Sequence, residues 1–172
     1  MKMPIVLERC TIRRWRPEDE ASLAKHANNR KIWLGLRDLF PHPYTSQDAH
    51  EFLQRVTAKE LQTVFCIDIS GAAVGGLGIR IGEDVHRYTG ELGYWLSEDF
   101  WGQGVVSEAV PAVTEYCFEK YALRRIFAEP YANNPASARV LEKAGFTLEG
   151  RLKNDVFKNA QILDSLLYAK TK

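Results

Sequence analysis

Apolar residues along this chain follow two different periods, and together these predict a domain of mixed α/β structure. Alternating or short β-branched runs predict strands, and apolar residues recurring every three or four positions predict helices. Strands are expected over residues 7–15, 63–69, 73–81, 91–96, 125–129, 146–156 and 161–169. Helices are expected from Pro17 to about residue 27, from Thr45 or Ser46 to about Lys59, from the glycines near residue 104 to Lys120, and over residues 135–144.

The order of these segments fits a single domain over residues 1–172. Strands and helices alternate without strict βαβ regularity, so the pattern predicts a mixed sheet of about seven strands with about four helices. A turn at Ser70 and Gly71 joins the second and third strands into a hairpin. Residues 28–44, which include Pro41 and Pro43, are expected to be irregular.

Composition narrows the class of protein further. Hydrophobic residues make up 45% of the chain and charged residues 26%, which is ordinary for a globular domain, and the net charge of +1 argues against a nucleic-acid partner. Glu8 and Arg9 interrupt the first apolar residues before a signal-peptide core could form, and no run approaches the ~20 residues of a membrane helix. We therefore expect a cytoplasmic protein that has no membrane partner.

The cysteines and histidines show no spacing that is typical of a metal site. Three cysteines, Cys10, Cys66 and Cys117, are far apart and form no Cys-x-x-Cys pair, and no two histidines stand four positions apart. We expect reduced, mostly buried cysteines and no bound metal.

The most informative segment is residues 100–109, in which glycines stand between a predicted strand and a predicted helix. The first N–H groups of a helix have no partners inside the helix and lie at the positive end of its dipole, and glycines let a phosphate approach them. A Walker loop would need Lys and Ser or Thr after Gly104, where Val105 and Val106 stand, and a Rossmann loop would need a third glycine nearby. Alone, the segment also fits a simple glycine turn before a packed helix.

A second motif decides between these interpretations. Residues 133–146 contain Asn134, Ser137, Leu141, Lys143, Gly145 and Phe146. This spacing resembles the Asn-x-x-Ser…Leu-x-Lys-x-Gly-Phe signature of the GNAT superfamily of N-acetyltransferases, and residues 101–106 take the place of its pyrophosphate loop. With residues 91–96 and 107–109, the chain looks most like the branch of bacterial ribosomal-protein N-terminal acetyltransferases. The resemblance runs from about Leu7 to the C-terminus.

The resemblance implies a fold and a cofactor site. The fold is the GNAT fold, a mostly antiparallel sheet splayed between the fourth and fifth strands, and the co-substrate held in that splay is acetyl-CoA. The residues implied to bind it are Tyr94, Trp95, Leu96, Trp101, Gly102, Gln103, Gly104, Val105, Val106, Asn134 and Ser137. Two positions depart from the family pattern: Trp101 stands where most members have Arg or Gln, and Val106 replaces a small residue.

The chemistry of acetyl transfer sets the remaining candidates. An uncharged amine, a donor to the oxyanion and a proton for the leaving thiolate are needed, but no protein nucleophile. The family's usual tyrosine acid is replaced by Glu142, so Ser137 is the candidate acid, with a helix-start hydroxyl as its alternative. Glu91 is the candidate base, and edge solvation or a water relay are its alternatives. Gly93 could mark a bulge that frees a backbone amide, or could simply permit close packing.

The sequence therefore predicts an acetyl-CoA-dependent N-acetyltransferase that acts directly on a primary amine. The acceptor is a protein N-terminus or a small amine, and the protein is a monomer or a homodimer. The missing tyrosine and Val106 keep an alternative open, a non-catalytic acyl-CoA-binding module of the same fold. Acidic residues that could attract a cationic amine are Glu83, Asp84, Asp155 and Asp164.

Overall fold

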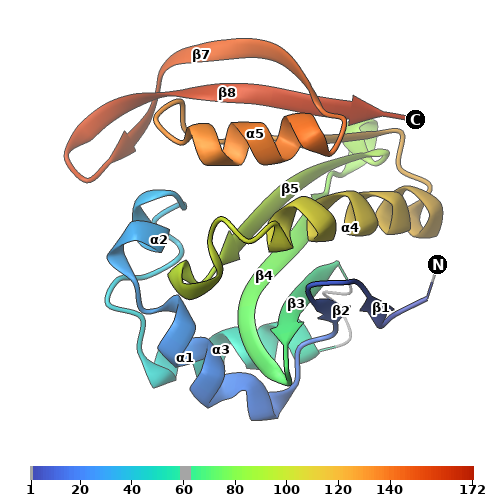
Figure 1. Ribbon diagram of the computed structural model, residues 1–172. Coiled ribbons are helices and arrows are strands. Elements are labelled where there is room, and N and C mark those ends of the chain that lie inside the picture. Colours follow the sequence, from blue (N-terminus) through green and yellow to red (C-terminus); the bar gives the residue numbers. More distant parts are fainter. Residues whose placement is uncertain (1, 59–62) are drawn as a thin grey trace.

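The computed structural model describes residues 2–58 and 63–172 and contains one eight-stranded sheet (Figure 1). The spatial order of the strands is β1-β2-β3-β4-β5-β6-β8-β7, and only the β5–β6 pair is parallel. The predicted class, a mixed and mostly antiparallel sheet, is confirmed, although the predicted count was one strand low. The strands are β1 (Ile5–Val6), β2 (Thr11–Arg13), β3 (Val64–Ile69), β4 (Ala72–Ile81), β5 (Thr89–Leu96), β6 (Arg125–Ala128), β7 (Thr147–Lys158) and β8 (Gln161–Thr171).

Helices cover both faces of the sheet. The α-helices are α1 (Glu20–Ala27), α2 (Arg30–Leu34), α3 (Ser46–Thr57), α4 (Val105–Tyr121) and α5 (Pro135–Lys143). Short 3-10 turns cover Pro17–Asp19, Asp84–His86 and Glu98–Phe100. In Figure 1, α4 crosses the middle of the sheet, α5 lies beside the C-terminal hairpin, and α1 and α3 lie at the opposite end.

Two predicted segments differ from the structure. The strand expected over residues 7–15 is shorter, because the chain turns between Leu7 and Cys10, where the Leu7 N–H donates to the Cys10 carbonyl (2.9 Å). The first part of the chain instead forms β1, which pairs with β2. The segment 28–44 contains the helix α2, capped by the Asn29 side chain, which accepts from the Lys31 N–H. The helix predicted from Thr45 or Ser46 was expected to end at about Lys59, and that position lies outside the described residues.

The alternation of side chains along the central strands explains why both faces are covered. In β3, Phe65 and Ile67 point into the core beneath α4, and Cys66 between them points toward α1 and α3. Because successive side chains of a strand point to opposite faces, a nearly continuous apolar run is what a sheet covered on both faces requires. Burial of Cys10, Cys66 and Cys117 is confirmed.

The sheet divides between β5 and β6. Their pairing is limited to Thr89–Glu91 opposite Arg125–Phe127, after which no register between the two strands is found among the described residues. On its other side, β5 stays paired with β4 in continuous register, and Gly93 lies opposite Gly78. This continuous register excludes a bulge at Gly93, one of the two roles considered for this glycine. The backbone of β5 becomes available because β6 diverges from it, as the predicted splay requires.

The described residues, 2–58 and 63–172, hold neither a candidate membrane helix nor a candidate metal cluster. None of the helices there is both long enough and apolar enough to cross a membrane. Within the same ranges, no group of three or more His, Cys, Asp or Glu side chains is placed so that it could hold a metal ion.

Candidate functional site

A cavity of about 870 Å³ runs from the β5–β6 division to the start of α4. It is lined by β5, by the loop before α4, and by the first turns of α4 and α5. Apart from Gln103, every predicted cofactor residue lines this cavity: Tyr94, Trp95, Leu96, Trp101, Gly102, Gly104, Val105, Val106, Asn134 and Ser137. The fold thus brings together two motifs that are separated in the sequence by β6.

The loop before α4 presents backbone N–H groups to this cavity. Gly102 and Gly104 have positive φ angles of 73° and 81°, which favour glycine, and Gly104 is the N-cap residue of α4. The first hydrogen bond inside the helix runs from the Glu108 N–H to the Gly104 carbonyl (3.2 Å). The N–H groups before it, including those of Val105 and Val106, are the ones that a helix leaves without internal partners. This end of the cavity is suited to a phosphate.

The side chains of Trp101 and Gln103 hold the loop in shape instead of reaching into the cavity as polar ligands. The Trp101 indole N–H donates to the Leu96 carbonyl (2.8 Å), and the Gln103 amide donates to the Asp99 carbonyl (2.9 Å). Val106, whose branched side chain departs from the family pattern, is half-buried and packs against the core. These residues therefore set the path of the loop.

The wall formed by β5 has backbone groups that face the cavity. The Ser97 N–H donates to the Val74 carbonyl of β4 (2.8 Å). Because alternate residues of an antiparallel strand bond the same neighbour, the backbone groups of Leu92 and Tyr94 face the opposite way, toward the division of the sheet. Gly93 is exposed there, and a Cβ added to it would have no heavy atom within 4 Å. Gly93 therefore neither forms a bulge nor permits tight packing. Its lack of a side chain leaves free space beside the β5 wall.

Two hydroxyl groups meet across the cavity. The Tyr94 hydroxyl lies 2.6 Å from the Ser137 hydroxyl and also donates to the Ser137 carbonyl (3.3 Å). Burial raises the pKa of Tyr94 to about 12, while the bond from Ser137 acts in the opposite direction. Tyr94 is thus a protonated, oriented donor at a site where the sequence suggested only its backbone. The sequence did carry a signal for this role, a tyrosine directly after Gly93 in the predicted strand.

The helix α5 is capped by Asn134 and not by Ser137. The Asn134 side-chain oxygen accepts from the Ser137 N–H (3.1 Å), which satisfies one of the free donors of the helix start. The alternative role of Ser137, a local helix-start hydroxyl, is therefore filled by its neighbour. The Ser137 side chain is left to Tyr94 and the cavity.

The predicted base, Glu91, is tied to two cations. Its carboxylate pairs with both Arg37 and Arg80, and its side chain is only 14% exposed. Both carboxylate oxygens therefore accept from guanidinium N–H groups, Oε1 from Arg37 and Oε2 from Arg80. Glu129, which follows β6, is different: burial and the nearby charge of Glu91 raise its pKa. Sequence analysis missed Glu129 as a candidate base because its position beside Glu91 depends on the β5–β6 pairing.

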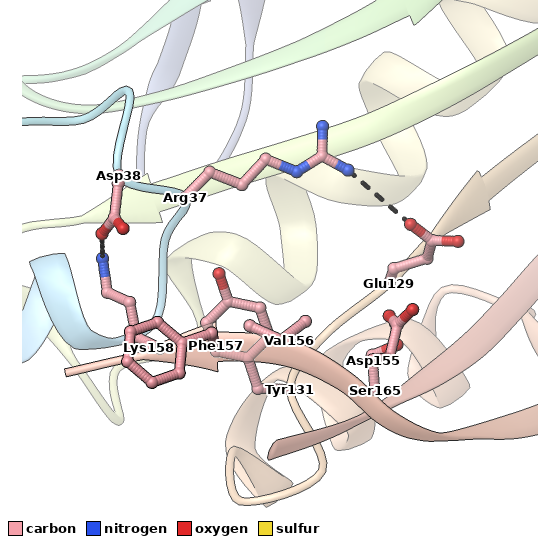
Figure 2. Close-up of a pocket in the computed structure, with 9 residues that line it drawn as sticks. All are labelled: Arg37, Asp38, Glu129, Tyr131, Asp155, Val156, Phe157, Lys158 and Ser165. Carbon is pink, nitrogen blue, oxygen red and sulfur yellow. Dashed lines mark hydrogen bonds and ion pairs between the residues drawn. The ribbon is translucent and has the colours of Figure 1, made fainter. Parts of the chain in front are cut away.

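A smaller cavity of about 380 Å³ adjoins the first one (Figure 2). Arg37, Glu129 and Tyr131 line both cavities, so they mark the boundary between them. Asp155 lies on the side of Glu129 in Figure 2, and its carboxylate accepts from the Ser165 hydroxyl (2.5 Å). The other predicted acidic residues lie outside both cavity linings, and one of them, Asp164, binds Arg151.

Arg13, at the end of β2, and Arg125, at the start of β6, form ion pairs within the fold. Arg13 is buried between Asp19 and Asp68, and Arg125 pairs with Glu149. Among the cations that line the large cavity are Arg139 and Lys143, which stand one turn apart on α5.

Comparison with known proteins agrees with this geometry. The model of a family described as acetyltransferase (GNAT) domain matches residues 9–147. The ribosomal-protein-serine acetyltransferase of Escherichia coli is 40% identical over 82 residues, which are 48% of this chain and 46% of that protein, so the chain matches only about half of that relative's length. The L-amino acid N-acetyltransferase AaaT of Escherichia coli is 27% identical over 133 residues, covering 77% of this chain and 80% of AaaT.

Solved structures share the whole fold. A GNAT-family acetyltransferase from Bacillus anthracis superposes with a TM-score of 0.83 at 25% identity, covering 98% of both chains. RimL, described as a ribosomal L7/L12 alpha-N-protein acetyltransferase in complex with coenzyme A, superposes with a TM-score of 0.86 at 21% identity, covering 99% of this chain and 98% of RimL.

Proposed function

This chain belongs to the GNAT acetyltransferase family, and from that premise we propose that it transfers an acetyl group from acetyl-CoA directly to a primary amine. The observation that carries the proposal is the contact between the Tyr94 and Ser137 hydroxyls at the division of the sheet, in a cavity that also contains the free amides of α4. A binding module would need the amides but not the half-buried hydroxyl pair.

The residues present fit acetyl-CoA. The amides at the start of α4 would hold its pyrophosphate. A Cβ at Gly104 would come within 3.4 Å of the Arg9 side chain. Arg139 and Lys143 add positive charge along the same cavity. When bound, acetyl-CoA supplies an acetyl group already activated as a thioester, so positioning can provide much of the rate.

Groups of the chain itself would then stabilise the developing charge and transfer the protons. The backbone N–H groups of β5 that face the division, at Leu92 and Tyr94, would donate to the negative charge that develops on the carbonyl oxygen. The 2.6 Å contact allows either hydroxyl to donate, and when Tyr94 donates to the Ser137 hydroxyl oxygen, the Ser137 proton can pass to the departing thiolate. The side chain of Ser137 is the acid, and Tyr94 orients it.

Glu129 is the base in this proposal, and Glu91 supports it. An acceptor amine is protonated at neutral pH and must lose a proton before it can attack. Glu129 has the raised pKa that suits proton uptake, and the charge of Glu91 contributes to that rise. The amine nitrogen would then bond to the acetyl carbon as the carbon–sulfur bond breaks, and the second proton that the nitrogen loses would replace the one that Ser137 gives to the thiolate.

The acceptor would enter through the smaller cavity, which adjoins Glu129. Relatives named for ribosomal-protein and for L-amino acid acetylation support a protein N-terminus and a small amine, respectively, as acceptor classes. The predicted cytoplasmic location and the monomeric or homodimeric state belong to the same proposal.

The test is acetyl transfer by the purified chain. A panel of N-terminal serine and alanine peptides, free amino acids and diamines is incubated with acetyl-CoA, and free CoA and acetylated product are measured together. We expect product equal to the CoA released with at least one acceptor. Tight acetyl-CoA binding without product from any acceptor class would favour the non-catalytic alternative.

A further inference from the structure

Arg37 lies at the boundary between the two cavities and reaches the two carboxylates of the candidate site. Its guanidinium pairs with Glu91, and one of its nitrogens lies 3.6 Å from a Glu129 oxygen (Figure 2). Glu91 stands on β5 at the last β5–β6 pair, and Glu129 directly follows β6. Arg37 comes from a different part of the chain, residues 35–40, which follow α2 and which we call the strap.

The strap is also attached to the opposite wall. The next residue, Asp38, accepts a hydrogen bond from the Lys158 ammonium near the end of β7 (2.6 Å). Lys158 is buried and lies over the Trp33 ring, 3.8 Å from its centre. Consecutive side chains of the strap therefore contact the two sides of the smaller cavity, and Figure 2 shows Arg37 and Asp38 pointing in different directions.

The side chains of Arg37, Glu91 and Glu129 differ in exposure, and this difference determines which of them can move. The side chains of Glu91 and Glu129 are 14% and 29% exposed, whereas that of Arg37 is 60% exposed. Glu91 is fixed on β5 and Glu129 directly follows β6, whereas the cation reaches both from the strap. Arg37 can leave by a change in its own side chain, with no change in the sheet, because exposed ion pairs are held by little energy.

We propose that the Arg37 guanidinium occupies the subsite of the acceptor's ammonium group, and that the acceptor binds by displacing it. The inference rests on the proposed acetyl transfer, because that reaction brings a protonated amine to Glu129. A guanidinium and an ammonium are both cations with several N–H donors, so one can replace the other between two carboxylates. Arg37 is therefore a specificity-determining residue: it excludes weakly cationic and uncharged molecules from the reacting position.

Displacement also prepares the proton transfer. While Arg37 is in place, its positive charge favours the ionised form of Glu129. Once Arg37 has moved away, Arg80 stays paired with Glu91, and the ammonium takes the place of Arg37 between Glu91 and Glu129. When the ammonium gives its proton to Glu129, the repulsion between the two carboxylates is relieved.

The test uses Arg37→Ala, with Arg37→Gln as a second variant and Arg80→Ala as the matched control. Arg80 pairs with the same Glu91 but lies outside both cavity linings. Methylguanidine, which has the end group of the arginine side chain, serves as the probe. Binding is followed by NMR titration without acetyl-CoA, and inhibition is followed by kinetics with an acceptor found in the panel.

We expect methylguanidine to bind Arg37→Ala and to compete with the acceptor, but to have little effect on the parent or on Arg80→Ala at the same concentration. The acceptor KM of Arg37→Ala should fall by roughly two- to fivefold, because the internal competitor is gone. An Arg37→Ala variant that is folded by melting temperature but neither binds methylguanidine nor shows a lower KM would overturn the inference. Because NMR titration needs no turnover, this outcome is distinct from a parent that acetylates nothing.

Discussion

The hydroxyl groups of Tyr94 and Ser137 lie 2.6 Å apart, although the two residues are 43 positions apart in the chain. Tyr94 is fixed on β5, and Ser137 is fixed in the first turn of α5 by the Asn134 cap. The pair therefore joins the two walls of the cofactor cavity. The catalytic role of Ser137 can be separated from its role in stability, because its hydroxyl contacts Tyr94 whereas its backbone N–H donates to Asn134.

Replacing Ser137 by Ala should slow catalysis without loosening the helix. The backbone N–H that Asn134 caps remains, so the melting temperature should stay near that of the parent. If the hydroxyl protonates the thiolate, kcat should fall on the order of a hundredfold with a smaller change in the KM for acetyl-CoA. Steady-state kinetics and thermal melting of the same preparation test this.

Asn134→Ala is the matched control for that experiment. Loss of the cap should lower stability by about 1 kcal/mol, because a helix donor loses its partner. Normal turnover by a folded Ser137→Ala variant would show that the acid lies elsewhere, and a water would then be the best candidate.

Gly104→Asp should abolish binding of acetyl-CoA. The change places a side chain and a negative charge beside the free amides of α4, and the positive φ of 81° adds backbone strain. Gly71→Asp provides the control, since Gly71 has a similar φ of 87° in the β3–β4 turn, where an added Cβ meets no heavy atom within 4 Å. Both variants should melt earlier, but calorimetry should find lost affinity only for Gly104→Asp. Equal affinity in the two variants would refute the assigned loop.

The low-pH limb of kcat/KM should belong to Glu129. A base must be deprotonated, so activity should fall as the pH drops through the raised pKa of this carboxyl group. Glu129→Gln should remove the limb and lower the rate by about a hundredfold. Glu91→Gln removes a neighbouring negative charge, so the pKa of Glu129 should fall and the limb should move to lower pH. A limb that is unchanged in both variants would point to a water relay.

Kinetics should be sequential, with both substrates bound before product leaves. All three cysteines are buried, and burial raises the pKa of Cys10 to about 11 and that of Cys117 to about 12. Thiols that are inaccessible and protonated are poor acetyl carriers. Double-reciprocal plots should intersect. Parallel lines, or an acetylated enzyme found by mass spectrometry, would contradict direct transfer.

Local patterns were sufficient for most of the fold. The β3–β4 hairpin, the long helix α4 and the C-terminal hairpin follow from runs of apolar residues whose period is set by backbone geometry. Errors arose where a local interaction outweighed the pattern. The turn at residues 7–10 shortened the first predicted strand, and the side-chain cap at Asn29 started a helix in a segment that looked irregular.

What the sequence by itself determined was the fold class, the family resemblance and the loop at Gly102 and Gly104, because these depend on residues close together in the chain. What only the tertiary structure decided was which distant side chains share a cavity. Arg37 and Glu91 are 54 positions apart, and their contact exists only because the strap crosses the end of the β5–β6 pairing. Glu129 becomes the better candidate base for the same reason: its proton affinity is set by burial and by the charge of a neighbouring strand, and neither quantity is encoded in its local sequence.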